Sequence, residues 1–294
     1  MRRRAAARPS PRAQATRLTL VLVLLAGAGC TSPAAVKRYS VAAALVTARL
    51  PDASAALGAS CRRTQSYRLR RASTAWYSGD SVAAACAGRD SALRDVGRAN
   101  RALAAYFAAL GRLAGAKAGE MDATLSALGD AAAEAGHFGK PQGDAVTALA
   151  TFAAARAAHG YRRAKLREAV GEQNANVQIV ISVLHDILDR DFARYLRDDE
   201  TALTAFYRAA LAESGTREPL AAILVRDSYD ERQEELTRRV EAVGALDRAL
   251  LVAGRGHQRL YDARDQLGAK ELLGSIVSTA RELDIAIAKI DKAF

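Results

Sequence analysis

Apolar residues recur at alternating steps of three and four positions through most of the chain after Ser81. This spacing places them on one side of an α-helix and leaves the charged residues on the other side. No stretch alternates with a period of two, as a half-buried strand would. The clearest stripe consists of Val96, Ala99, Leu103, Tyr106, Leu110 and Leu113. The pattern therefore predicts long amphipathic helices that bury their stripes against one another.

Short segments rich in glycine and proline separate the stripes, most clearly at 136–144 and 213–219. Glycine ends helices and proline prevents their continuation. Between these breaks we expect one long helix over about 91–136, helices over 144–212 with a softer stretch at 171–176, and one or two helices over 217–292 with a break near 253–257. Long helices joined by short turns pack as up-and-down bundles. The predicted fold is all-α: an elongated antiparallel helical bundle with coiled-coil-like packing.

The last stripe keeps a strict four-three heptad spacing. It comprises Leu273, Ile276, Ala280, Leu283, Ile287, Ile290 and Phe294. A heptad stripe requires a helical partner. Residues 273–294 are therefore a candidate surface for a protein partner.

The first 29 residues have the composition of an export signal. Six arginines and no acidic residue precede an apolar run from Leu18 to Ala28. About 20 apolar residues are needed to span a bilayer as a helix, so this shorter run predicts a cleaved signal peptide rather than a permanent anchor.

The end of this leader, Gly27-Ala28-Gly29-Cys30, resembles the lipobox of bacterial lipoproteins, although a leucine is usual where Gly27 stands. The resemblance covers the leader only. It implies that the Cys30 thiol carries a diacylglyceryl group, that cleavage makes Cys30 the first residue, and that fatty acids such as palmitate anchor the chain. Because no aspartate follows the cysteine, Thr31 resembles the members sorted to the outer membrane, facing the periplasm. We therefore expect a signal peptide at 1–29, a lipid anchor and short tether at 30–38, and the helical domain at 39–294.

The formal charge of +11 does not by itself predict nucleic-acid binding. Loss of the leader removes six of the 43 basic residues, and the remaining 37 against 32 acidic residues give +5. A modest excess of this size lacks the strongly basic surface that nucleic-acid binding requires. We expect no nucleic-acid partner.

Two cysteines besides Cys30 remain after processing, Cys61 and Cys86. An exported chain meets an oxidising compartment, so the pair is predicted to form a disulfide, with two buried thiols as the alternative. Bridged Cα atoms lie within about 7 Å of each other. With a turn at 78–80, Cys61 would lie farther from the turn than Cys86, so we expect a bent or extended loop at about 58–80.

This segment also combines aromatic and basic side chains. Arginines interleaved with aromatic rings bind phosphate, lipid headgroups or glycans. The alternative is a solvated patch in which arginine stems cover a packed tryptophan. The candidate ligand or anion patch comprises Tyr67, Arg68, Arg70, Arg71 and Trp76.

No constellation typical of catalysis or metal binding occurs in the sequence. Glu134 and His137 show the Glu-x-x-His spacing of carboxylate metal sites once, without a second copy. His185 and Asp189 share a helix face, which predicts an ion pair or hydrogen bond. The run 198–200 is acidic and is expected on a solvated face. We expect no catalytic residue, no metal site and no cofactor.

Two functions fit these observations. The first is a lipid-anchored, non-enzymatic envelope lipoprotein that serves as a structural or protein-interaction module. The alternative is a ligand-binding or sensory helical bundle in the periplasm. A concave site lined by Trp76, Tyr67 and several arginines would favour the second, and a continuous apolar groove along 273–294 would favour the first.

Overall fold

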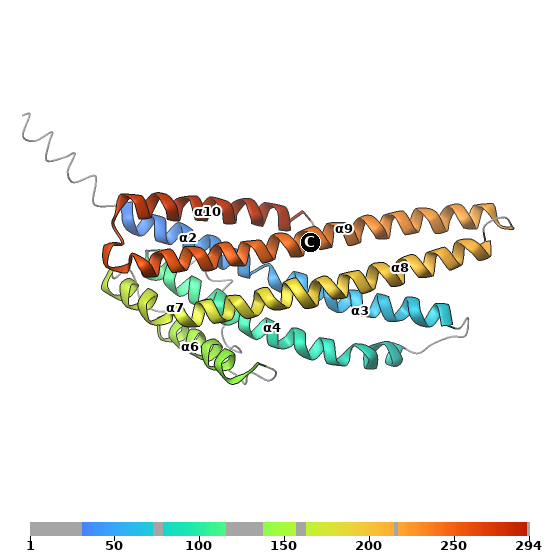
Figure 1. Ribbon diagram of the computed structural model, residues 1–294, viewed down its shortest axis with the longest axis horizontal. Coiled ribbons are helices and arrows are strands. Elements are labelled where there is room, and N and C mark those ends of the chain that lie inside the picture. Colours follow the sequence, from blue (N-terminus) through green and yellow to red (C-terminus); the bar gives the residue numbers. More distant parts are fainter. Residues whose placement is uncertain (1–30, 73–78, 116–137, 157–162, 215–216, 293–294) are drawn as a thin grey trace, which may run out of the picture.

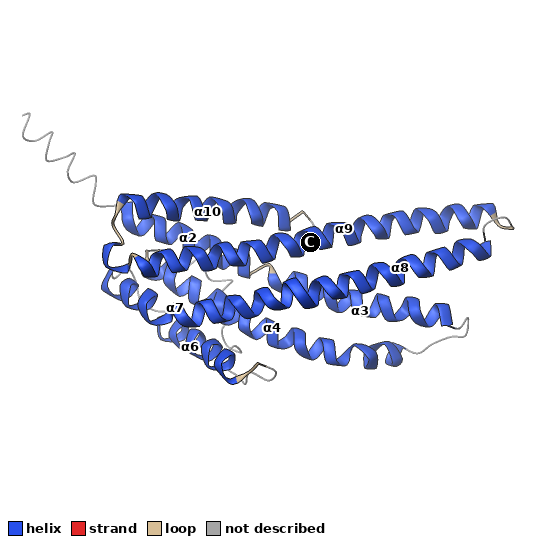
Figure 2. Ribbon diagram, viewed as in Figure 1, coloured by secondary structure: helices blue, strands red, loops and turns tan. Residues whose placement is uncertain are grey.

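The computed structural model describes residues 31–72, 79–115, 138–156, 163–214 and 217–292. Within these ranges the secondary structure is helical and no strand occurs (Figure 2). The α-helices are α2 (Thr31–Thr47), α3 (Leu50–Ala72), α4 (Gly79–Leu113), α6 (Lys140–Arg156), α7 (Arg163–Asp186), α8 (Ala193–Ser214), α9 (Pro219–Asp262) and α10 (Lys270–Ile290). A π-helix, η4 (Ile187–Phe192), joins α7 to α8, and a short 3₁₀ turn, η5 (Arg264–Gln266), follows α9.

The helices lie along one long axis and form an elongated bundle (Figure 1). The nearly continuous run α7–η4–α8 lies beside α9, which returns antiparallel to it. Helices α2, α6 and α10 pack at the end where α2 begins, whereas α3 packs on α8 and α9 toward the opposite end. The all-α, elongated and antiparallel fold is confirmed, and coiled-coil-like packing stays a prediction.

The heptad stripe of α10 packs against other helices of the same chain, with Leu273 and Ile287 only partly buried. Ile276, Ala280, Leu283 and Ile290 are buried, and α10 packs against α2 and α9. Phe294 lies outside the described residues. These helical partners of the stripe belong to the same chain, and a protein partner for residues 273–294 stays a prediction.

Helix α9 continues through the glycines that were expected to break it. A Cβ atom on Gly256 would lie 2.5 Å from Cε2 of Tyr39 and 2.9 Å from Cγ2 of Thr279. Glycine at this position lets α2 and α10 approach the backbone of α9. The break falls instead between Asp262 and Lys270, and the predicted softening at 171–176 lies within α7.

The helix expected over 91–136 has different ends in the structure. Helix α4 begins at Gly79 and ends at Leu113. Gly115 follows with a φ of 93°, the left-handed conformation that favours glycine after a helix end. The described chain thus turns well before residue 136, and residues 116–137, with Glu134 and His137, lie outside the described part.

The predicted tether is corrected as well. Helix α2 begins at Thr31, and Ala35 and Val36 belong to the buried core. The packed domain therefore starts inside the segment 30–38. Cys30 and the leader lie outside the described residues, and no helix of the described part is long and apolar enough to cross a membrane.

Cys61 and Cys86 form a disulfide between α3 and α4, with Cα atoms 6.1 Å apart. The loop expected at about 58–80 is nevertheless wrong, because α3 stays helical to Ala72. The error came from placing the turn at 78–80. With α3 ending at Ala72 and α4 starting at Gly79, straight helices bring the two cysteines together.

Candidate functional site

A cleft of about 450 Å³ lies between α3 and α8, beside Tyr67. One wall carries Tyr67, Arg68 and Arg71 from α3. The other wall is made of small α8 side chains, namely Thr201, Ala202 and Ala205. We call this the Tyr67 cleft.

Three residues of the predicted patch meet in this cleft. Tyr67 is 9% exposed, whereas Arg68 and Arg71 are exposed at its edge. Arg70 is also exposed, but it is not among the lining side chains. Trp76 lies outside the described residues. The structure thus assembles Tyr67, Arg68 and Arg71 into one concave surface.

Aromatic contacts hold Tyr67 in place. Its ring stacks on Phe206 with centroids 5.0 Å apart and meets Tyr207 edge-on at 6.1 Å. The Tyr207 hydroxyl lies 2.8 Å from the Ser228 hydroxyl on α9. Such contacts between rings fix their orientation as well as burying area. The floor of the cleft is therefore tied to α3, α8 and α9.

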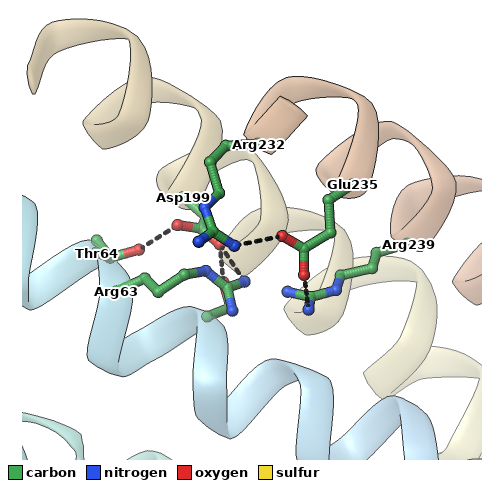
Figure 3. Close-up of polar contacts among 7 residues, drawn as sticks. Arg63, Thr64, Asp199, Arg232, Glu235 and Arg239 are labelled. Atoms are coloured by element: carbon green, nitrogen blue, oxygen red, sulfur yellow. Dashed lines mark hydrogen bonds and ion pairs between the residues drawn. The ribbon is translucent and has the colours of Figure 1, made fainter. Parts of the chain in front are cut away.

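Tyr67 and a buried carboxylate, Asp199, line the same small cavity. Figure 3 shows this carboxylate, which connects α8 to α3 through hydrogen bonds. Asp199 on α8 is 3% exposed. Its carboxylate accepts hydrogen bonds from Ser60 at 2.6 Å, Arg63 at 2.9 Å and Thr64 at 3.2 Å. Buried carboxylates are tolerated only when they are paired and hydrogen-bonded in this way.

Helix α9 adds a second carboxylate to the same cluster. Glu235 accepts a hydrogen bond from Arg232 at 3.0 Å and another from Arg239. Figure 3 shows Arg63, Arg232 and Arg239 converging on Asp199 and Glu235. A cavity of about 10 Å³, which is near the size of one water molecule, lies among these side chains. We call these five charged residues the Asp199 cluster.

The charges of the Asp199 cluster do not cancel, because three arginines face two carboxylates. Burial, and next the like charge of Arg63, lowers the pKa of Arg239. Burial acts to raise the pKa of Glu235, but the hydrogen bond from Arg232 and the nearby arginine charges outweigh it and leave the pKa lowered. Arg68 and Arg71 add two more positive charges at the cleft. Among these side chains, five arginines therefore face two carboxylates.

Tyr67 separates the cleft from the Asp199 cluster. Burial raises the pKa of Tyr67, and neighbouring Tyr207 and Asp199 raise it further. The hydroxyl therefore keeps its proton at neutral pH and can donate a hydrogen bond. A protonated hydroxyl beside unbalanced arginines suits an anionic ligand.

The Asp199 cluster was missed in the sequence, where residues 198–200 were expected on a solvated face. This expectation is wrong for Asp199. A signal was present, since Asp199 occupies a three-four position in the stripe formed by Phe192, Leu196 and Leu203, all of which are buried. An acidic residue at a stripe position indicates a buried carboxylate with basic partners.

A second basic surface lies between α3 and α4. This open groove of about 710 Å³ carries Arg62, Arg94, Arg98 and Arg101. It differs from the Tyr67 cleft because no aromatic side chain lines it. Its exposed arginines provide a matched control for charge effects.

The two histidines in the described residues, His185 and His257, make structural contacts. His185 lies 2.6 Å from Asp247 on α9, rather than pairing with Asp189 on its own face. His257 is fully buried, with Nε2 2.5 Å from the Tyr106 hydroxyl and Nδ1 2.9 Å from Oδ1 of Asn174. No group of three or more potential metal ligands occurs in the described part of the chain.

Comparison with known proteins gives no relative: no family model, curated protein or solved structure matches this chain.

Proposed function

We propose that this chain is an envelope lipoprotein, anchored through Cys30 in the outer membrane and facing the periplasm, that works by binding rather than by catalysis. The leader and the lipobox-like Gly27-Ala28-Gly29-Cys30 support the anchor. Two or more acyl chains hold a protein firmly on a membrane, at about 0.8 kcal/mol for each buried methylene.

We further propose that the helical domain binds an anionic ligand in the Tyr67 cleft. The supporting observation is the unbalanced positive charge around a concave, aromatic-floored site. Four residues of the α10 heptad stripe, which would have served a partner helix, are buried against α2 and α9. The ligand-binding function is therefore better supported than interaction through that stripe.

The position of the cleft in the bundle limits which anions could reach it. Helix α2 begins at one end of the bundle, and α3 continues toward the other end (Figure 1). At 1.5 Å per residue, α2 and the part of α3 up to Tyr67 together span about 50 Å. With the bundle upright on the membrane that holds Cys30, the headgroups would not reach the cleft. The ligand we propose is a soluble anion, or an anionic group on a structure other than the membrane that holds Cys30.

A structural or protein-interaction role is the second candidate, and one observation favours it. The first turns of α9 expose three large apolar side chains at the tip of the bundle: Leu220 at 70%, Ile223 at 56% and Leu224 at 60%. Apolar residues grouped on a surface are typical of sites that contact another protein.

The anchor predicts that Cys30 is acylated in a diderm bacterial host. Wild-type protein grown with an alkyne analogue of palmitate should be labelled and should sediment with membranes. Cys30→Ala should lose the label and keep an unprocessed leader, because the thiol is the site of the first modification. Mass spectrometry of the first residues checks both results. An unmodified thiol on position 30 of the wild-type protein would contradict the anchor.

Anion binding predicts a specific effect of the two cleft arginines. The double variant Arg68→Gln/Arg71→Gln should bind inorganic pyrophosphate about 10-fold more weakly than wild type at low ionic strength, because each exposed charge contributes about 0.7 kcal/mol. Isothermal titration calorimetry measures the affinity. Binding should also weaken at about 0.15 M salt, where screening is strong.

Arg62→Gln/Arg94→Gln is the matched control, because it removes the same charge from the groove between α3 and α4. This control should change the affinity less than about twofold, since a screened charge outside the cleft contributes little. Equal losses in both double variants would show that the anion follows overall charge and does not occupy the Tyr67 cleft.

A further inference from the structure

The start of helix α9 carries apolar side chains on two of its sides. One side packs into the bundle, where Val225 and Tyr229 contact the core and the Tyr229 ring lies 5.6 Å from that of Tyr207. The other side carries Leu220, Ile223 and Leu224, each more than half exposed. Their spacing of three and four residues places them on one face of the helix. The described part of the bundle leaves this face uncovered, and we call it the α9 tip.

The α9 tip lies at the end of the bundle away from the proposed anchor. Helix α2 begins at Thr31, next to Cys30 in the sequence, at the opposite end (Figure 1). Helix α9 has 44 residues, so at 1.5 Å per residue it separates the two ends by about 65 Å. The three apolar side chains belong to the first two turns of this helix. A surface that contacts them would meet the free end of the bundle.

The α9 tip is too small to form a stable protein interface by itself. The next exposed side chains along α9 are charged, namely Arg226, Asp227, Asp230 and Glu231. A stable interface takes about 800 Å² and about 20 residues from each partner, which is far more than three side chains. A lipid bilayer needs no matching shape, because apolar side chains insert at the boundary of its acyl chains. The size of the patch therefore favours a lipid surface over a protein or a second copy of this chain.

Exposed arginines surround the α9 tip. The described residues of this end of the bundle are 66–72, 79–85, 208–214 and 217–227. Six exposed arginines lie there: Arg68, Arg70, Arg71, Arg208, Arg217 and Arg226. They outnumber the four acidic residues Asp80, Glu213, Glu218 and Asp227. Arg217 precedes the apolar group and Arg226 follows it. Apolar side chains bounded by basic ones suit the interface of an anionic membrane.

We propose that the α9 tip docks on an anionic lipid bilayer other than the one that holds Cys30. The three apolar side chains insert at the acyl boundary, and Arg217 and Arg226 lie at the level of the headgroup phosphates. The bundle then connects two membranes. Only the choice of bilayer rests on the proposed anchor, and the docking does not require the Tyr67 cleft.

Vesicles test this docking with the full chain. Wild-type protein held by its anchor in neutral phosphatidylcholine vesicles should capture fluorescent vesicles that contain about one-third phosphatidylglycerol. It should capture neutral fluorescent vesicles about 10-fold less, because an excess of arginines favours binding to an anionic surface. Flotation of the protein with the first vesicles alone measures the anchor separately. If the chain is not acylated, the fluorescent vesicles are added to the free protein instead.

Serine substitutions test the apolar group. The triple variant Leu220→Ser/Ile223→Ser/Leu224→Ser should weaken capture about 30-fold, because each leucine or isoleucine that leaves water favours binding at least threefold. The matched control Leu45→Ser/Val240→Ser/Ile285→Ser removes three exposed apolar side chains elsewhere on the bundle. It should change capture less than about twofold, because side chains that stay in water contribute no burial.

Glutamine substitutions test the arginines. Arg217→Gln/Arg226→Gln should lower the preference for anionic over neutral vesicles about threefold or more, because these two charges lie beside the inserted side chains. Arg62→Gln/Arg94→Gln removes the same charge from the groove between α3 and α4. This control should keep the preference within about twofold, since charges farther than a Debye length from the surface are screened.

A fluorescent label shows where the contact occurs. An environment-sensitive fluorophore on Ala221→Cys should become brighter and shift to the blue when anionic vesicles are added, because it leaves water. The same fluorophore on Val240→Cys, about 30 Å farther along α9, should not respond. Cys61 and Cys86 are bonded to each other, so they do not take up the label.

Docking on lipid is overturned if wild type captures no anionic vesicles, if both triple variants lose capture equally, or if the label at position 221 stays in water. A label that leaves water only as the protein concentration rises, without vesicles, would assign the tip to a second copy of the chain instead. Capture lost only in Leu220→Ser/Ile223→Ser/Leu224→Ser, with a response at position 221 and none at position 240, would support docking.

Discussion

Replacing Asp199 by alanine is expected to lower the free energy of unfolding by about 3–5 kcal/mol, the cost of breaking a buried ion pair from one side. The carboxylate accepts hydrogen bonds from Ser60, Arg63 and Thr64. Without it, the partly buried Arg63 faces Arg239 with less compensation. Urea denaturation of the purified variant and wild type measures the change.

Two further variants separate charge from packing. Asp199→Asn keeps the shape and an acceptor oxygen but removes the charge, so it should lose less than Asp199→Ala. The double variant Asp199→Leu/Arg63→Met replaces both partners by apolar side chains and should recover much of the loss, because paired buried charges are often replaceable by apolar groups.

Glu200→Ala serves as the neighbouring control. Glu200 is exposed and accepts a hydrogen bond from Gln233 at 3.3 Å. Its removal should change the free energy of unfolding by less than about 0.5 kcal/mol, as for most surface substitutions. A loss below about 1 kcal/mol in Asp199→Ala would contradict a buried, tightly paired cluster.

The arrangement of helices was predictable because it rests on periodicity. The stripe from Val96 to Leu113 is buried over its whole length, as its three-four spacing indicated. The disulfide partners also followed from the cysteine count. Local patterns of this kind indicate which face of a helix is buried, and the folded protein buries that same face.

The sequence does not indicate which buried helix face packs against which other helix. The stripe of α10 would look the same whether its partner were another chain or α2 of its own chain. The glycine at 256 looked like a break, but it allows Tyr39 to approach and donate a hydrogen bond to the Ala253 carbonyl at 2.5 Å. This contact joins positions 214 residues apart, so no local signal contains it.

The candidate site was predictable only in part for the same reason. Tyr67, Arg68 and Arg71 are close in sequence and could be grouped by inspection. Arg63, Asp199 and Glu235 come from three helices, and only folding brings them to the small cavity that Tyr67 also lines. The π-helix η4 has no sequence pattern that distinguishes it from the α-helices on either side.

The second large effect expected is a loss of stability in acid caused by His257. Asn174 uses its amide group to donate to Gln258 at 2.8 Å, so its Oδ1 accepts from Nδ1 of His257. Nε2 then accepts from the Tyr106 hydroxyl. The imidazole is therefore neutral, and burial lowers its pKa to about 3.

This lowered pKa determines the direction in which stability changes with pH. Below the ordinary histidine pKa of about 6.5, the unfolded chain takes up a proton that the folded chain excludes, and stability falls as the pH falls. The contribution is about 1.4 kcal/mol for each pH unit, or about 2.7 kcal/mol between pH 6.5 and 4.5. Above pH 6.5 this contribution is fully present.

Denaturation of wild type and His257→Gln at pH 7.0 and 4.5 isolates this contribution from the carboxylates, which titrate in both proteins. The stability of wild type should fall by about 2.7 kcal/mol more than that of the variant. His185→Gln is the control, because the pKa of His185 is shifted in the opposite direction to that of His257. The hydrogen bond with Asp247 raises the pKa of His185, so its stabilisation is present below pH 6.5 and is lost as the pH rises through the folded pKa. Removing His185 should therefore leave the acid loss in place, whereas equal acid losses in wild type and His257→Gln would mean that the buried imidazole accepts its proton without unfolding.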